Sequence, residues 1–417
     1  MTLLPRFVAP AGTVLRASDL LGWLRGALGR GAELRRLQEA FEARYGLRHT
    51  YLLSSGRAGM TILLRALAER TPGRDEVVVP GYTCYSVAAS AVRAGLRVRP
   101  VDVSPRALDF DPDALDAVDL SRTVAITATS LYGIPAGLPR LERFARERGV
   151  AFVDDAAQTL DGRVGERWAG SFGDAGIYSF DKGKNITSLQ GGVVTCRDDE
   201  LAERLAHAFR AMPAPSPTAV TVQSLKLLAY AVLLRPSLYW IPNRAMRLGE
   251  TPFELDYPTT ALAPSLAGLV RRQFERIDGL TESRIRVAGR LRAGLAGVRG
   301  LILPEHPGAR CVYPRFPVVL EEGARRDGLL ARLVRVGIGA TGSYPLPLID
   351  VPDLRPHLAR EVADTLGARA IARGMLTLPT HGHVTDGDVA TMTIIVAGGS
   401  SKEGPLSPTL TNSKEVR

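Results

Sequence analysis

The stretch at residues 170–185, GSFGDAGIYSFDKGKN, contains an apolar run at 175–180 that ends shortly before a lysine, Lys184. Upstream, residues 150–158 read VAFVDDAAQ, a second short apolar run that ends in two aspartates. Downstream, a Gly-Gly pair opens a third run over residues 192–196. Short apolar runs bounded by turn residues are typical of buried strands, so these three segments predict three strands of one sheet.

The same pattern continues on both sides of this region. Further strands are predicted at 51–53, 76–79, 96–103 and 123–129, with helical patterns between them, as at 60–68 and 138–148. Strands that alternate with helices predict an α/β fold, in which helices cover both faces of a mostly parallel sheet. A helix from about 262 to 295, followed by short strands, predicts a smaller α+β domain at the C-terminal end.

Three segments follow from this pattern. We predict a large α/β domain over residues 1–250, a small α+β domain over 251–398 and a disordered polar tail over 399–417. The most apolar stretch, at 225–242, predicts a buried or interface helix, with peripheral attachment to a membrane as the lesser alternative.

The composition excludes several classes of protein. The chain has 417 residues, of which 45% are hydrophobic, so disorder and collagen-like structure are excluded for most of it. The net charge is +10, but the arginines are scattered among acidic residues, and we predict no nucleic-acid partner. Three widely spaced cysteines predict neither a disulfide framework nor a metal site. Since no signal peptide or membrane span is recognisable, we expect a cytoplasmic protein.

Lysine is scarce, which restricts any chemistry that needs a primary amine. Of 53 lysines and arginines only five are lysines, and only Lys182 and Lys184 lie in the first 225 residues.

Polar motifs follow the predicted strands, at the sheet edge where ligands bind in open α/β folds. A glycine turn that opens a helix, SSGRAG at 54–59, can hold an anion, although such a turn can also be a simple helix cap. Asp155 can hold a proton on a ring nitrogen, and Asp154 is expected to face solvent or cap a helix. Gln158 is expected on the same helical face as Asp155, and Lys184 can supply the amine. Together, the anion-binding turn, the carboxylate and the amine predict pyridoxal phosphate as the cofactor.

Over roughly residues 20–395 the sequence resembles the DegT/DnrJ/StrS family of pyridoxal-phosphate aminotransferases, which have fold type I. The resemblance is carried by seven motifs in order: SSGRAGMTILLRAL, VVVPGYTCYSVAASAVRAGLRVRPVDVSP, SLYG, VAFVDDAAQTLDG, GSFGDAGIYSFDKGKN, GIGATGSYPLP and LTLPTHGHVTDGDV. It implies that Lys184 is the catalytic lysine, because Lys184 and not Lys182 lies five residues after Ser179 and seven before Gly191.

The resemblance also implies the other site residues. The cofactor phosphate would be held by Gly56, Arg57, Ala58 and Ser179, the ring nitrogen by Asp155 and the ring hydroxyl by Gln158. Cys84 stands where many members have an aromatic residue that stacks on the ring, a role that Tyr82 or Tyr85 could take over. Candidate substrate contacts are Tyr82, Ser130 and Tyr344.

Some residues depart from the family pattern. Arg57 replaces a common threonine, so a guanidinium or backbone contact would replace a hydroxyl contact to the phosphate. Ser130 stands where a histidine often precedes LYG, and the family's Asn-x-x-Arg segment is not recognisable at 257–266.

The implied reaction transfers an amino group, from glutamate, to a keto group of a nucleotide-linked deoxysugar, in a homodimer with sites at the subunit interface. Two alternatives stay open: a pyridoxal-phosphate enzyme with another reaction or a non-sugar substrate, and a regulatory protein that keeps the fold without enzymatic activity.

Overall fold

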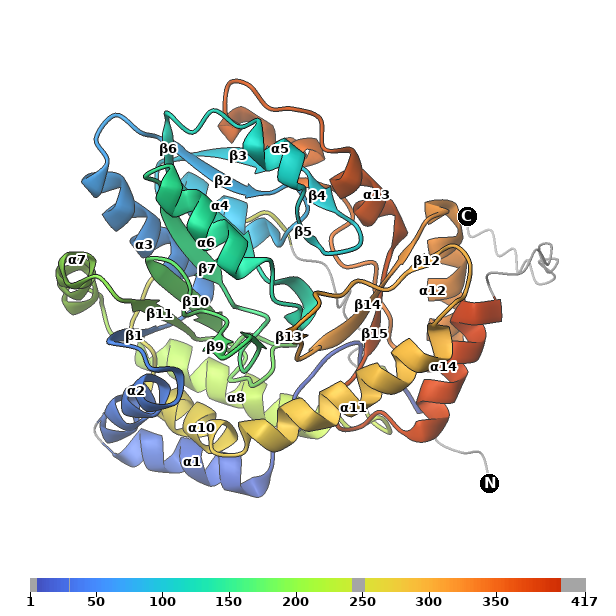
Figure 1. Cartoon of the computed structure of the whole chain (residues 1–417). Helices are drawn as coiled ribbons and strands as arrows, with labels where there is room; N and C mark the ends of the chain where they lie inside the picture. The colour runs from blue at the N-terminus through green and yellow to red at the C-terminus, as the bar shows by residue number, and fades with distance from the viewer. Residues whose placement is uncertain (1–5, 30, 242–251, 399–417) are drawn as a thin grey trace, which may run out of the picture.

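A computed structural model describes residues 6–29, 31–241 and 252–398, and in these residues the central sheet has seven strands (Figure 1). Their order across the sheet is β1 (His49–Leu53), β11 (Gly192–Cys196), β10 (Ala175–Ser179), β7 (Ala151–Asp155), β6 (Thr123–Thr129), β2 (Glu76–Pro80) and β3 (Arg97–Val101). Each predicted strand is therefore present, with bounds that differ from the prediction by a few residues.

The sheet is mostly parallel, as predicted, and β11 is the exception. It runs antiparallel to both of its neighbours, β1 and β10, whereas β10, β7, β6, β2 and β3 run parallel to one another. The first residue of β11, Gly192, consequently lies at the edge where the other strands end, opposite Leu53 and Ser179.

Helices cover both faces of the sheet, which confirms the predicted fold class. On one face lie α3 (Gly56–Arg70), α4 (Tyr85–Arg93) and α7 (Asp199–Arg210); on the other lie α2 (Ala32–Tyr45), α6 (Leu138–Glu147) and α10 (Pro264–Phe274). Side chains of each strand alternate between the two cores, as in β2, where Val77 and Val79 face α3 and Val78 faces the other side.

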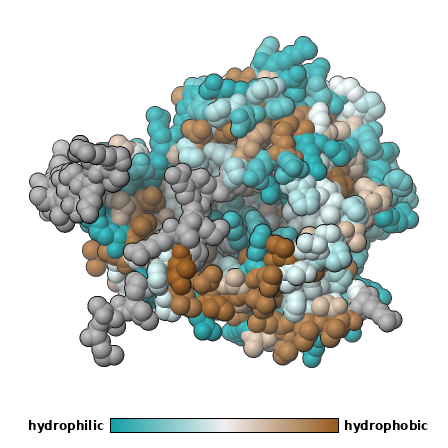
Figure 2. Space-filling view, turned by 180° about the vertical axis from the view of Figure 1, so that it is seen from behind, coloured by the Kyte–Doolittle hydropathy of each residue, from teal (hydrophilic) through white to brown (hydrophobic). Residues whose placement is uncertain are grey.

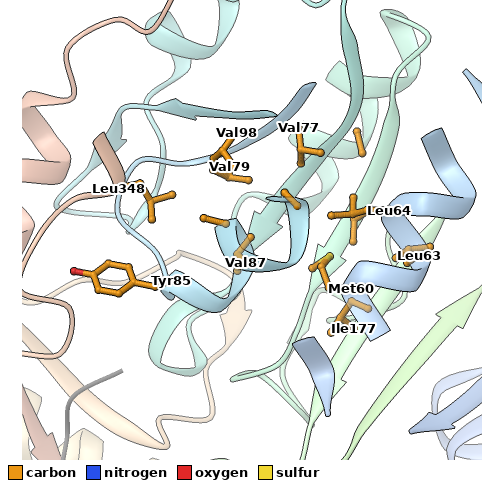
Figure 3. Close-up of a cluster of buried hydrophobic side chains, with 14 of the residues drawn as sticks. Met60, Leu63, Leu64, Val77, Val79, Tyr85, Val87, Val98, Ile177 and Leu348 are labelled. Atoms are coloured by element: carbon orange, nitrogen blue, oxygen red, sulfur yellow. The ribbon is translucent and has the colours of Figure 1, made fainter. Parts of the chain in front are cut away.

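The core beneath α3 and α4 is built largely from buried aliphatic side chains (Figure 3). It contains Met60, Leu63 and Leu64 of α3, Val77 and Val79 of β2, Val87 of α4, Val98 of β3, Ile177 of β10, and Leu348. This burial fixes α3, and with it the glycine turn that precedes α3, against the sheet.

The C-terminal half builds a second, three-stranded sheet in the order β12 (Leu301–Ile302), β14 (Arg315–Leu320) and β15 (Met375–Pro379). The helices α11 (Ile277–Leu295), α12 (Arg326–Arg335) and α14 (Asp386–Gly398) share its core. The single helix predicted over 262–295 is wrong, because α10 ends at Phe274 and α11 begins at Ile277. Although α10 lies beyond residue 250, it packs beneath the large sheet, and the proposed domain limits stay a prediction.

The described residues form further α-helices and strands. They are α1 (Ala17–Leu28), which packs on α10, α5 (Pro112–Asp116), α8 (Pro217–Leu233), α13 (Leu366–Gly374), β4 (Val103–Ser104), β5 (Asp109–Phe110), β8 (Arg163–Val164), β9 (Arg167–Trp168) and β13 (Ala309–Arg310). The predicted tail at 399–417 lies outside the described residues.

The apolar stretch is only partly as predicted. It overlaps α8, which is not a buried helix, because Leu225, Leu228 and Val232 are all exposed. Among the described helices none combines the length and the hydropathy needed to cross a bilayer.

Truncating Leu63 to alanine should lower the free energy of unfolding by about 2–5 kcal/mol, because the side chain is fully buried and would leave a cavity. Chemical denaturation of both proteins measures the difference. Leu366→Ala is the matched control, because Leu366 is exposed and its truncation should change stability by less than about 0.5 kcal/mol. Equal losses in both variants would contradict this account of the core.

Candidate active site

The glycine turn after β1 is set by a close approach of two backbones. A Cβ on Gly192 would lie 2.4 Å from the backbone nitrogen of Gly56 and 2.7 Å from its Cα, so only glycine fits at the start of β11. At the N-terminus of α3 the Ser55 hydroxyl accepts a hydrogen bond from the Ala58 N–H at 3.2 Å. The turn is therefore a capped helix start, and its position is fixed by β11.

Ser179, at the end of β10, lies beside this turn. A Cβ on Gly56 would be 3.3 Å from the Cβ of Ser179. The Ser179 hydroxyl accepts a hydrogen bond from the Asp181 N–H at 3.3 Å. The structure thus brings Gly56, Ala58 and Ser179 together, in the arrangement expected for an anion at a helix N-terminus.

The Arg57 side chain is held by the segment that precedes α10. Its guanidinium lies 4.9 Å from the ring centroid of Tyr257 and 3.5 Å from the carboxylate of Glu254. Either the guanidinium or the backbone of Arg57 was expected to contact the cofactor phosphate. The backbone contact is the better supported, because the guanidinium already contacts Tyr257 and Glu254.

Asp155 ends β7 as a buried carboxylate whose Oδ1 accepts a hydrogen bond from the Ala157 N–H at 3.1 Å. Burial raises the pKa of Asp155, and the Ala157 hydrogen bond and the positive charge of Lys184 lower it in part. Lys184 is thus within electrostatic reach of Asp155. It is half-buried, whereas Lys182 is exposed, which agrees with the choice made from the spacing.

The expectation for Asp154 is wrong, because its side chain faces neither solvent nor a helix end. It is fully buried, and its Oδ2 accepts hydrogen bonds from the Gly170 N–H at 2.5 Å and the Phe172 N–H at 3.3 Å. Burial raises the pKa of Asp154 to about 7. Successive residues of a strand point to opposite faces, so the two aspartates have separate environments.

Gln158 lies on a turn rather than on the predicted helix. Its Oε1 accepts a hydrogen bond from the Tyr132 N–H at 3.0 Å, and its Nε2 donates one to the Tyr344 hydroxyl at 3.2 Å. Tyr132 has a φ of 55°, a left-handed conformation that costs free energy and is concentrated at functional sites. The motif SLYG was visible in the sequence, but no role had been predicted for Tyr132.

Two predicted substrate residues belong to one aromatic cluster. The Tyr82 and Tyr132 hydroxyls lie 3.1 Å apart, and the rings of Tyr82 and Tyr344 meet edge to face at 5.7 Å. The third predicted residue, Ser130, is fully buried, and its hydroxyl accepts a hydrogen bond from the Ala136 N–H at 3.1 Å. Ser130 therefore shapes the loop after β6 instead of presenting a free hydroxyl.

Cys84 directly precedes α4 as its N-cap residue. Its Sγ lies 2.9 Å from the Ser86 hydroxyl, and the side chain is half-buried. The Tyr85 hydroxyl donates a hydrogen bond to the Leu346 carbonyl at 2.9 Å and accepts one from the Leu346 N–H at 3.0 Å. These two hydrogen bonds restrain Tyr85, so it is not free to stack on a cofactor ring in place of Cys84.

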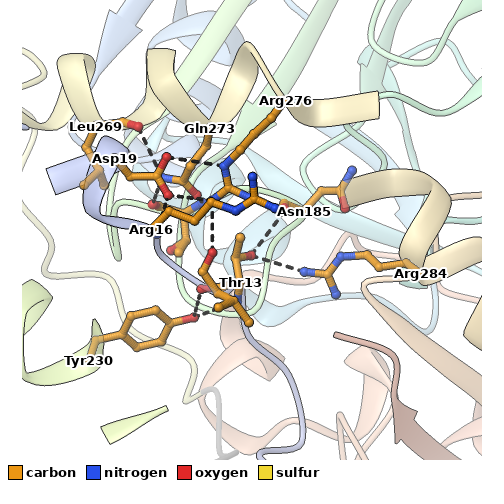
Figure 4. A network of polar contacts seen from close by, with 11 residues as sticks. Thr13, Arg16, Asp19, Asn185, Tyr230, Leu269, Gln273, Arg276 and Arg284 are labelled. Atoms are coloured by element: carbon orange, nitrogen blue, oxygen red, sulfur yellow. Dashed lines mark hydrogen bonds and ion pairs between the residues drawn. The ribbon is translucent and has the colours of Figure 1, made fainter. Parts of the chain in front are cut away.

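A buried polar network that no sequence motif predicted supports the backbone of the loop that carries Lys184 (Figure 4). The Thr13 hydroxyl donates to the carbonyls of Lys184 at 2.9 Å and Asn185 at 3.2 Å. The Tyr230 hydroxyl accepts from the Thr13 N–H at 2.8 Å. Arg284 donates to the Gly12 carbonyl at 2.7 Å and to the Thr13 hydroxyl at 3.2 Å. These residues are far apart in the chain, so no local pattern could have joined them.

Arg284 is unusual because it is fully buried among neutral acceptors. Its guanidinium donates hydrogen bonds to the carbonyls of Gly12 and Pro314 and to the Thr13 hydroxyl, and burial lowers its pKa to about 10. A guanidinium still keeps its proton at neutral pH in such a site, so its donors hold the N-terminal segment in place.

Residues 19–221 and 260–396 match the DegT/DnrJ/EryC1/StrS aminotransferase family. The chain belongs to this family. Family membership makes the protein a pyridoxal-phosphate-dependent aminotransferase and confirms the resemblance found in the sequence.

Individual relatives have low sequence identity to this chain, but the similarity extends over most of their length. The chain is 27% identical to the GDP-perosamine synthase of Caulobacter vibrioides, over 84% of this chain and 86% of that protein. It is 28% identical to the UDP-N-acetyl-3-dehydro-alpha-D-glucosamine 3-aminotransferase of Acidithiobacillus ferrooxidans, over 76% of each. The crystal structure of the aminotransferase TlmJ from Streptoalloteichus hindustanus has the same fold, with a TM-score of 0.75 and 24% sequence identity. The match covers 94% of this chain and 98% of TlmJ.

The residues present fit the family's cofactor. The turn at 56–58 and Ser179 form a cradle of the kind that holds a phosphate, and a Cβ at Gly192 would displace it. Asp155 is a buried carboxylate, and a protonated ring nitrogen would supply a matching charge. Lys184 is within electrostatic reach of Asp155 and would be the amine available to the cofactor.

Replacing Gly192 with alanine should weaken pyridoxal phosphate binding by about tenfold or more, because the new Cβ would push the turn at Gly56 away from Ser179. Titration of the cofactor's absorbance on the purified protein measures the affinity. Gly279→Ala on α11 is the control, since a Cβ there meets nothing within 4 Å. The cradle would be wrongly assigned if both variants bound the cofactor as tightly as the wild type.

Replacing Asp154 with asparagine should remove a pH-dependent loss of stability. The pKa of Asp154 is raised from 3.8 to about 7, so the folded state binds a proton more tightly than the unfolded state. Its contribution to stability is therefore greatest at low pH and falls as the pH rises from 3.8 to about 7. Denaturation across this range should show the variant gaining stability relative to the wild type as pH rises. A constant difference would show that Asp154 does not titrate there.

Proposed function

We propose that the protein transfers an amino group to a keto group of a nucleotide-linked sugar, with Lys184 as the catalytic residue. The observation that carries this proposal is that Lys184 lies within electrostatic reach of the buried Asp155, at the sheet edge that also holds the turn at 56–58. An acid, an amine and an anion cradle in one site are the three groups that this cofactor needs.

Each group has a distinct task. When bound, pyridoxal phosphate supplies an electron sink that stabilises negative charge at the carbon carrying the amino group. Asp155 would hold the proton on the ring nitrogen, and the Gly56 turn with Ser179 would hold the phosphate. Lys184 would hold the cofactor through its Nζ and, once released by the substrate amine, would serve as the base that moves the proton during the transfer.

The nucleotide-sugar substrate is supported by the relatives. The proteins from Caulobacter vibrioides and Acidithiobacillus ferrooxidans are named for GDP- and UDP-linked sugars. We assign the aromatic cluster of Tyr82, Tyr132 and Tyr344 to the sugar side of the site, because it adjoins Gln158 and joins both halves of the chain.

Three further statements are part of the same proposal. The amino donor is glutamate, and the active form is a homodimer with its sites at the subunit interface; both are supported by family membership. The protein acts in the cytoplasm, which is supported by three free thiols, at Cys84, Cys196 and Cys311.

Replacing Lys184 with alanine should lower kcat by about a thousandfold or more, because both covalent binding of the cofactor and proton transfer depend on its amine. A coupled assay of 2-oxoglutarate release from glutamate, with GDP- and UDP-linked keto sugars, measures the rate. Lys182→Ala is the control, because this exposed lysine lies two residues away and should keep wild-type turnover.

The two variants also separate the alternatives. Wild-type turnover in Lys184→Ala would refute the role of Lys184. Consumption of the sugar without release of 2-oxoglutarate would favour another reaction type or another donor.

A further inference from the structure

The helix α8 has two unlike faces. Its inner face is anchored: Gln223 donates to the Ser188 carbonyl at 3.0 Å, Leu227 is buried, and the Tyr230 hydroxyl accepts from the Thr13 N–H. These positions recur at intervals of four and three residues, so they form one stripe along the helix. The anchors fix which side of α8 faces outward.

The opposite stripe is apolar and exposed. Val222, Leu225, Leu228 and Val232 have 44–62% of their surface exposed, at helical spacings that place them on one side. The helix α1 adds a second exposed set, Leu21, Leu24 and Leu28. Apolar residues gather along the lower part of the molecule in Figure 2, where Figure 1 places α8 and α1. We call these seven residues the apolar face.

The exposed charges on the two helices of the apolar face have a single sign. Residues 204–249 contain no aspartate or glutamate, although they include Lys226 and Arg235, which are both exposed. On α1, Arg25 is exposed, and the one acid, Asp19, is buried in an ion pair with Arg276 at 2.5 Å. The apolar face is thus bordered by cations and has no exposed carboxylate on either helix.

This charge pattern decides between two occupants. In a two-fold dimer the same patch on each copy would face the other, so both sides would carry Lys226, Arg235 and Arg25 with no exposed acid on either helix to balance them. An anionic lipid surface offers the opposite charge at its headgroups and an apolar layer just below them.

We propose that the apolar face binds an anionic lipid surface, with α8 lying in the plane of the membrane. The leucines of α8 and α1 enter the boundary between headgroups and acyl chains, while Lys226, Arg235 and Arg25 contact the lipid phosphates. Tyr239 and Trp240, just after α8, are half-buried aromatic residues of the kind found at membrane interfaces. The proposal is independent of the sugar substrate.

Cosedimentation of the full-length, cofactor-loaded protein with lipid vesicles tests it. The vesicles are phosphatidylcholine alone, or equal parts of phosphatidylcholine and phosphatidylglycerol. We expect the partition coefficient to be at least about tenfold higher with phosphatidylglycerol and to fall as salt is added. Leu225→Glu/Leu228→Glu should lose this binding, and since both residues are exposed, the fold and the cofactor absorbance should persist.

The control is Leu366→Glu/Ile394→Glu, which makes the same change at leucine and isoleucine side chains 67% and 69% exposed on α13 and α14. It should bind vesicles like the wild type. The proposal is overturned if the wild type stays in the supernatant with both vesicles, or if the α8 variant sediments as well as the control. It is equally overturned if light scattering shows that the α8 variant halves the particle mass, because the apolar face then joins two copies.

Discussion

The contact between the backbones of Gly56 and Gly192 is the constraint on which the rest of the active site depends. Because β11 runs against its neighbours, its first residue meets the turn that follows β1, at a separation that leaves no room for a Cβ. The same reversal places the end of β10 beside that turn, and the chain leaving β10 carries Ser179 and then Lys184. One antiparallel strand in a parallel sheet thus brings the anion cradle and the amine to the same edge.

The end of β7 shows how neighbouring residues of one strand can serve different purposes. Asp155 and Asp154 are chemically identical and both buried, but they point to opposite faces of the sheet. Asp155 has Lys184 nearby and a site in which a charged ring fits. Asp154 satisfies the backbone N–H groups of Gly170 and Phe172, so it orders the loop before β10 at the cost of a buried carboxylate.

Features set by local sequence were predictable. Strand runs, glycine turns and the spacing from Ser179 to Lys184 to Gly191 depend on a few neighbouring residues, and they led to the fold, the family and the cofactor. The burial of Asp154 was missed, because a strand end looks the same in sequence whether or not a loop folds over it. The break between α10 and α11 was missed because the residues at 275–276 include neither proline nor glycine.

Contacts between distant parts of the chain could not be inferred from one sequence. Thr13 and Lys184 are 171 positions apart, and Gln158 and Tyr344 are 186 apart. Their side chains carry no signature of a site on their own, and they become meaningful only when the two halves of the chain pack together. The resemblance to a family predicted which residues lie nearest the chemistry, and the structure added residues that contact them.

The buried guanidinium of Arg284 has a consequence for the order in which the protein assembles. The acceptors of its hydrogen bonds, at Gly12 and Thr13, lie about 270 positions earlier in the chain. They are therefore synthesised long before Arg284, the residue that donates to them. The large sheet is complete by residue 196, long before α11 is made. The hydrogen bonds that join Arg284, Thr13 and the Lys184 backbone can therefore form only after all strands of the sheet have been synthesised. Nascent chains can hold a native-like sheet while the loop that carries Lys184 still lacks these contacts.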